Sequence, residues 1–146
     1  MGRIVLRLRP WRAGDEEAFE PRADMAQEAR VNAWPWSKGP PGPTWTLMQG
    51  DQVLGMGGAV QGEDGAWLAW ATVADLGPRF WPEAVRLAGV VIDHMLARAD
   101  VRWLWAQARS EKPAAIRLLH RLGFRPHHLE TVAALDASIV CMLREG

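Results

Sequence analysis

The stretch Pro113-Ala114-Ala115-Ile116-Arg117-Leu118-Leu119-His120-Arg121-Leu122-Gly123-Phe124 decides the fold. Pro113 stands where a helix tolerates proline, in its first turn. Ile116, Leu119 and Leu122 recur at helical spacing and give the helix one apolar face. Gly123 then supplies the left-handed residue that commonly ends a helix. We therefore predict a short amphipathic helix that closes on a glycine and a buried phenylalanine.

The segments before this helix alternate between strands and helices. We predict strands over residues 4–9, 44–48, 52–61, 66–74 and 101–108, with tight glycine turns between the middle three. The run over 66–74 is almost all apolar, which is typical of a strand buried on both faces. Helices are predicted from Asp15, over 23–31, and from Pro82 to about residue 99. Residues 34–43 are too rich in Pro and Gly to be regular.

After the helix, residues 127–134 and 138–143 read as two further strands around Asp136. The step from the strand over 66–74 through a helix to the strand over 101–108 is a parallel crossover. We therefore expect a mixed sheet with helices on both faces. The 146 residues fit one compact domain over residues 1–146.

Composition excludes several classes of protein. The chain has 17 basic and 17 acidic residues, so no charge imbalance indicates nucleic acid or a membrane surface as a partner. Cys141 is the only cysteine, which excludes a disulfide framework. No signal peptide or spanning segment is recognisable, and we expect a cytoplasmic protein. The nine Trp and the absence of Tyr indicate aromatic packing in the core or an aromatic binding surface.

The helix ending in Leu122-Gly123-Phe124, followed by Arg125-Pro126, is similar to the signature of the Gcn5-related N-acetyltransferase (GNAT) family. The order of predicted elements matches that fold over nearly the whole chain. The resemblance implies an α+β fold with a mixed, mostly antiparallel sheet of about six to seven strands. It also implies that the parallel strands over 66–74 and 101–108 splay apart, with acetyl-CoA lying between them.

The resemblance further implies a set of cofactor-binding residues. Thr72 and Val73 lie on the first splayed strand, and Arg79 and Ala84 match the family's phosphate loop. Lys112 stands where an Asn usually opens the last helix. Pro82 replaces a glycine of that loop and removes one amide donor. Glu83 adds a negative charge at the same helix start, although both residues also suit an ordinary helix N-terminus.

The residues expected to carry the chemistry are missing. Leu119 stands where family members often have a Tyr that protonates the leaving thiolate, and the adjacent His120 is turned away by roughly 100°. Glu63, Asp64 and Asp75 flank the first splayed strand and read as turn residues rather than a general base. The catalytic residues therefore stay unknown. We expect no metal site, because His127 and His128 should point to opposite faces of a strand, with no Cys or carboxylate to complete a ligand set.

Two functions are compatible with these features. One is an acyl-CoA-dependent N-acyltransferase that transfers an acetyl group to a small-molecule or protein amine. The other is a non-catalytic domain that binds a protein partner through Trp34, Trp36 and Trp81, similar to acetyltransferase-like proteins of tailed phages and prophages associated with virion assembly. Neither the acceptor nor the oligomeric state can be read from the sequence.

Overall fold

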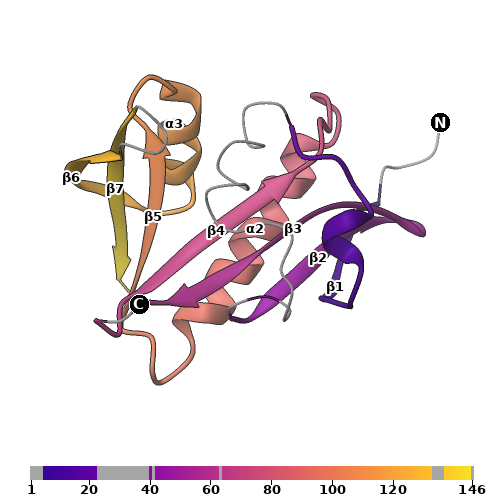
Figure 1. Ribbon diagram of the computed structural model, residues 1–146, viewed down its shortest axis with the longest axis horizontal. Helices are drawn as coiled ribbons and strands as arrows, with labels where there is room; N and C mark the ends of the chain where they lie inside the picture. Colours follow the sequence, from indigo (N-terminus) through magenta and orange to yellow (C-terminus); the bar gives the residue numbers. More distant parts are fainter. Residues whose placement is uncertain (1–4, 23–39, 41, 63, 133–136, 146) are drawn as a thin grey trace.

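The computed structural model describes residues 5–22, 40, 42–62, 64–132 and 137–145. One mixed sheet, with the strand order β1-β2-β3-β4-β5-β7-β6, organises these residues (Figure 1). The strands are β1 (Arg7–Pro10), β2 (Thr44–Gln49), β3 (Gln52–Gln61), β4 (Trp67–Val73), β5 (Trp103–Arg109), β6 (Arg125–Val132) and β7 (Ala137–Glu145). All neighbouring strands pair antiparallel except β4 and β5, which run parallel.

The predicted strands therefore exist, with boundaries that differ by a few residues. The hairpin between β3 and β4 closes as expected, with the Gly62 amide donating to the Ala66 carbonyl at 2.8 Å. The first strand was expected over residues 4–9 but runs over Arg7–Pro10, where it pairs with β2. Proline is tolerated there because β1 is an edge strand and lacks a second neighbour that would need its N–H.

Two helices connect the strands that follow β4. Helix α2 (Trp81–Leu96) begins with Pro82 in its first turn, as predicted, and buries Leu87, Ile92 and Met95. Helix α3 (Pro113–Arg121) is the short helix predicted from the sequence. Gly123 follows it with φ +94°, and the Phe124 amide donates to the Leu119 carbonyl at 3.0 Å. Phe124 is completely buried, so the turn at Gly123 carries the chain into the core.

Both helices contribute to the same apolar core. Its buried members come from β3, β4, β5, β7 and α2, together with Val101 and Phe124, and the inner face of α3 packs against them. A second core lies under β1, β2 and the start of α2 and includes Leu6, Leu47 and Leu87. The helix predicted over residues 23–31 lies outside the described residues, so helices on both faces of the sheet stay a prediction. No helix in the described ranges is long and apolar enough to cross a membrane.

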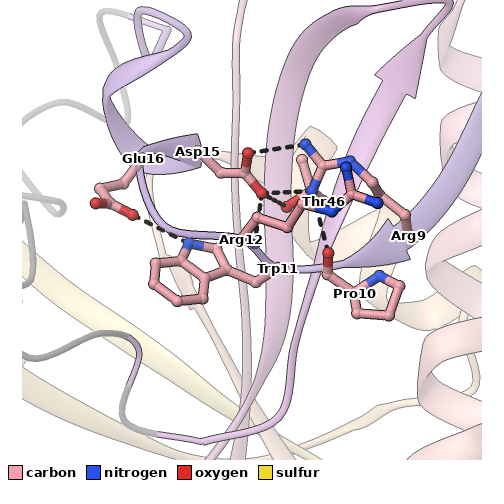
Figure 2. Close-up of polar contacts among 7 residues, drawn as sticks. All are labelled: Arg9, Pro10, Trp11, Arg12, Asp15, Glu16 and Thr46. Carbon is pink, nitrogen blue, oxygen red and sulfur yellow. Dashed lines mark hydrogen bonds and ion pairs between the residues drawn. The ribbon is translucent and has the colours of Figure 1, made fainter.

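The helix predicted from Asp15 is wrong. Residues Asp15–Glu17 form one turn of 3-10 helix, and Asp15 and Glu16 are only 5% and 8% exposed. The Asp15 carboxylate accepts two hydrogen bonds from the Arg9 guanidinium, at 2.7 and 2.8 Å, and one from the Thr46 hydroxyl at 2.7 Å (Figure 2). Asp15 therefore serves as the hydrogen-bond acceptor for donors on β1 and β2, which a local helix-start pattern does not reveal.

Burial of Asp15 by itself would raise the pKa of its carboxyl group. The hydrogen bonds from Arg9, Thr46 and the Arg12 amide outweigh that effect and lower the pKa to about 2. Glu16 accepts a hydrogen bond from the Trp11 indole at 3.0 Å in the same cluster (Figure 2). Through Asp15 this network links the edge strand β1 to β2.

Candidate functional site: a cavity between two diverging strands

The parallel strands β4 and β5 are paired at only one end. Their ladder consists of Trp67 with Leu104 and Leu68 with Trp105, although each strand has seven residues. Beyond Leu68, β4 keeps its ladder with β3, and β5 keeps its ladder with β7. Figure 1 shows the two arrows separating toward their carboxyl ends. The splay that the sequence resemblance implies is therefore present.

A cavity of about 310 Å³ lies where the strands separate. It lies between the sheet and both helices, and its lining is mostly apolar. Small side chains on every wall leave the space open: Ala69 and Ala71 on β4, Ala106 and Ala108 on β5, Ala84 and Ala88 on α2, and Ala115 on α3. The aromatic rings of Trp45, Trp70 and Trp81 form other parts of the wall. This volume is at the lower end of the range for small-molecule sites.

The charged residues that line this cavity, among those described, are basic. Among the described residues that line it, the charged ones are Arg109, at the end of β5, and Lys112, just before α3. Arg109 is paired with Glu111 at 2.9 Å, and the Glu111 side chain is half exposed. An apolar cavity bordered by cations favours a ligand that combines an apolar body with negative charge.

The cavity also explains why β4 is less buried than predicted. We expected residues 66–74 to be covered on both faces, but most of β4 is only half-buried and Ala71 is exposed. An apolar run is typical of a strand whose two faces are both covered by other elements. Here β5 leaves β4 after two residues, so the apolar side chains line a cavity instead of a packed layer.

The structure brings three of the five predicted cofactor residues to this cavity. Val73, Ala84 and Lys112 line it. The side chain of Thr72 is buried outside the lining, and Arg79 is exposed on the turn before α2. Sequence reasoning missed Arg109, whose position at the carboxyl end of the predicted strand over 101–108 could have indicated it.

The start of α2 differs from a plain phosphate-binding turn. Pro82 has no N–H to offer, while the Phe80 amide donates to the Gly77 carbonyl at 3.4 Å. Glu83, which would compete with an anion, pairs with Arg86 along the helix, with 3.0 Å between Arg86 Nε and Glu83 Oε2. The negative charge at this helix start is therefore partly offset by its own neighbour.

On the α3 wall of the cavity, position 119 carries no side chain that could donate a proton. Leu119 lines the cavity at the position where a Tyr is often found in the family. His120 is exposed and does not line the cavity, in agreement with the predicted turn of the helix. The apolar side chain at position 119 makes general-acid catalysis from this position impossible.

Comparison with known proteins identifies the architecture. No protein-family model and no curated protein matches the sequence. Among solved structures, a GNAT-family acetyltransferase from Bacillus cereus has a TM-score of 0.70 at 8% identity, with 97% of each chain covered. A chimera of the Vibrio cholerae spermidine N-acetyltransferase SpeG with hSSAT gives 0.68 at 12% identity, covering 96% of this chain and 95% of its own. A Bacillus subtilis acetyltransferase in complex with CoA gives 0.68 at 11%, with 97% and 99% covered.

The chain has the GNAT fold. The prediction of a mixed, mostly antiparallel sheet of six to seven strands with a parallel splayed pair is thereby confirmed. At identities of 8–12% the likeness extends to the fold alone. The resemblance to phage and prophage proteins stays a prediction, and Trp34 and Trp36, two residues of the expected binding surface, lie outside the described residues.

The opposite face of β5, β7 and β6 carries a second hollow of about 320 Å³. The expectation for His127 and His128 is wrong there, because a register shift between Pro126 and His128 brings both rings to the same side of β6. Their Nδ1 atoms are 2.7 Å apart, and both rings meet Trp105 edge-on. Cys141 and Glu130, a thiol and a carboxylate, lie beside His128.

Cys141 is the buried member of this group. Desolvation raises the pKa of its thiol, and the negative charge of Glu130 raises it further, so the thiol is protonated at neutral pH. Gln107 Nε2 donates to the sulfur at 3.8 Å from the neighbouring strand. Cys141 therefore lacks the environment of a nucleophilic cysteine.

Proposed function

We propose that this protein is an acyl-CoA-dependent N-acetyltransferase that transfers an acetyl group to an amine. One observation carries the proposal: β4 and β5 separate after two ladder pairs and leave an apolar cavity whose described charged residues are cations. Acetyl-CoA matches this chemistry, because its pantetheine arm is narrow and uncharged and its nucleotide end is anionic. The likeness to a Bacillus subtilis acetyltransferase solved with CoA supports the same ligand.

The cationic groups are at the right end of the sheet for this ligand. Parallel strands end at the same edge, so the turn carrying Arg79 and the segment carrying Arg109 and Lys112 both follow the carboxyl ends of the diverging pair. In the proposal, Lys112 and Arg79 face the phosphates. The main chain at Thr72 and Val73 and the small side chain of Ala84 accommodate the pantetheine arm.

The transfer itself needs little from the side chains. The amine nitrogen attacks the thioester carbonyl carbon, a C–N bond forms, and the C–S bond breaks to release the CoA thiolate. Leu119 cannot protonate that thiolate, and no carboxylate is among the described lining residues to accept the proton of the amine. Both protons therefore pass through water, and positioning of the amine against the thioester supplies the rate enhancement.

The acceptor is an amine, from a small molecule or a protein. The SpeG structures with the same fold are named for a polyamine, spermidine, which gives a first candidate class. We place the activity in the cytoplasm, in a single GNAT-like domain over residues 1–146.

Calorimetric titration with acetyl-CoA tests the cofactor. Loss of one phosphate contact is worth about 1.4 kcal/mol, so Lys112→Met should weaken binding about tenfold. Arg117→Ala is the matched control, because Arg117 is an exposed cation on α3 that does not line the cavity. No binding at millimolar acetyl-CoA, or equal loss in both variants, would refute the proposed site.

Turnover separates the enzyme from the second candidate, a non-catalytic protein that acts through a protein partner. The Leu119 wall is the observation that favours this candidate. CoA release would be followed with a free-thiol reagent over a panel of amines, including spermidine. Tight acetyl-CoA binding with no release above the uncatalysed rate for any amine would favour the second candidate.

A further inference from the structure

Three neighbouring strands place polar side chains in one row on the face opposite the main core. In the ladders, Cys141 on β7 stands across from Gln107 on β5 and across from His128 on β6. Glu130 follows His128 by two residues and so shares its side of β6. Leu104, Ala106 and Met142 of these strands alternate toward the main core instead.

The row brings together three groups that bind metal ions. The Cys141 sulfur, a carboxylate oxygen of Glu130 and a ring nitrogen of His128 all lie within 4.8 Å of one another. His128 Nε2 and Glu130 Oε1 are 2.9 Å apart. We propose that His128, Glu130 and Cys141 form a binding site for Zn²⁺ or a similar divalent transition-metal ion.

The separations suit the ligand set. A tetrahedral Zn²⁺ with ligand bonds of about 2.0–2.3 Å holds its ligand atoms roughly 3.3–3.6 Å from one another. The three ligand atoms lie within 4.8 Å of one another, so they must move closer together to share one ion, and the Glu130 side chain can adjust because it is 51% exposed. One imidazole nitrogen, one carboxylate oxygen and one thiolate sulfur are ligands that Zn²⁺ accepts readily, and binding of the ion displaces the proton of the Cys141 thiol to solvent.

Neighbouring side chains orient two of the three proposed ligands, as is usual in metal sites. If His128 binds through Nε2, its Nδ1 faces His127 Nδ1 at 2.7 Å and can donate a proton there, which fixes the ring. Trp105 packs edge-on against both rings, with centroid distances of 5.0 and 5.6 Å. Gln107 Nε2 donates toward the Cys141 sulfur. Each of the ligands His128 and Cys141 therefore has a partner that orients it.

The hollow over the row leaves room for a fourth ligand. It is lined by all three proposed ligands, together with Trp105 and Gln107, and its volume is about 320 Å³. Three protein ligands with one open position is the arrangement of zinc sites that keep a water or another small ligand. The site is independent of the proposed acetyl-CoA cavity, which lies on the other side of β5 and shares only Gln107 with the hollow.

Binding of Co²⁺ and Zn²⁺ to the intact chain tests the proposal. The protein would be prepared without a polyhistidine tag, reduced, treated with a chelator and titrated with Co²⁺, which reports a thiolate ligand by a charge-transfer absorption band. Zn²⁺ content after equilibrium dialysis would be measured separately. His128→Ala and Glu130→Gln change exposed side chains and leave the core intact, while Cys141→Ser removes the sulfur. His120→Ala on α3 is the control, an exposed histidine outside the row.

The expected result is one ion per chain, with a dissociation constant below about 10 µM and a thiolate band that disappears in Cys141→Ser. Because orienting partners alone are worth 10–100-fold in metal affinity, His128→Ala should weaken binding by more than about 100-fold. His120→Ala should bind as the wild type does. Absence of binding, binding without the thiolate band, or equal affinity in wild type and His128→Ala overturns the proposal.

Discussion

Replacing Asp15 with Asn should destabilise the protein strongly, because Asp15 joins three separate segments. Its carboxylate accepts two hydrogen bonds from Arg9 on β1, one from Thr46 on β2, and one from the Arg12 amide at 2.8 Å (Figure 2). The side chains of Arg9 and Asp15 are only 13% and 7% exposed. Asn removes the negative charge and leaves the largely buried Arg9 guanidinium without its counter-charge.

The structure sets the size of the effect. Removing one partner of a buried ion pair costs about 3–5 kcal/mol, and the partial exposure of Arg9 places this case at about 3. The pH dependence gives a second, independent magnitude. Lowering the Asp15 pKa from 3.8 to about 2 contributes about 2.5 kcal/mol to the free energy of unfolding.

The sign of the pH effect follows from the direction of the shift. The contribution of Asp15 is complete above pH 3.8, the value for the unfolded chain, and declines as the pH falls toward 2. Between pH 6 and pH 3 the wild type should lose about 1 kcal/mol through this carboxyl group. Asp15→Asn cannot lose that part, so the stability difference between the two proteins should narrow by about 1 kcal/mol over this range.

Urea unfolding followed by tryptophan fluorescence at pH 6 and pH 3 measures both quantities. With a slope of about 2 kcal/mol per molar urea, 3 kcal/mol shifts the midpoint by about 1.5 M. Glu16→Gln is the matched control, because Gln keeps an acceptor for the Trp11 indole and leaves the Arg9–Asp15 pair intact. A midpoint shift below about 0.3 M, or a difference between wild type and Asp15→Asn that stays constant from pH 6 to pH 3, would refute the reasoning.

Three further predictions concern the sheet, helix α2 and the cavity. Gly58→Ala should lower the free energy of unfolding by about 1–3 kcal/mol, because an added Cβ would lie 2.0 Å from the Pro43 carbonyl oxygen. Gly89→Ala in α2 should raise it by up to about 1 kcal/mol, because the nearest atom to an added Cβ, on Leu122, is 3.9 Å away. Thermal unfolding should therefore give a lower melting temperature for the first variant and a higher one for the second. Leu119→Tyr should raise the rate of CoA release at least tenfold in the proposed enzyme, because it places a phenol in the cavity; an unchanged kcat with retained acetyl-CoA binding would contradict this.

Much of the fold could be predicted because its signals are local. The helix over Pro113–Arg121, its end at Gly123 and the strand Gln52–Gln61 follow from spacing and turn residues alone. The two wrong predictions, for Asp15 and for the His127–His128 pair, share one cause: both depend on contacts between separate strands. Asp15 read as a helix start because its partners, Arg9 and Thr46, belong to other strands, and His127 and His128 read as opposed because no local pattern predicts the bulge on β6.

The residues of the candidate sites likewise fall into those that the sequence indicated and those that only the structure revealed. The resemblance around Leu122-Gly123-Phe124 led to the correct pair of strands and to Val73, Ala84 and Lys112 at the cavity. Arg109 was missed although it follows directly on the predicted strand over 101–108. The row of His128, Glu130 and Cys141 was missed because these residues gather only when the strand order places β7 next to β6.

The sequence by itself determined the helix ending at Gly123 and the order of strands and helices. It also showed Leu119 in place of the family's Tyr and Pro82 in place of a glycine of the phosphate loop. Each of these depends on the backbone preference or chemistry of a few adjacent residues. Only the tertiary structure decided that β4 and β5 part after two ladder pairs, and that a thiol, a carboxylate and an imidazole meet on the opposite face. Both depend on which strands become neighbours and in which register, and contacts between distant segments set that register.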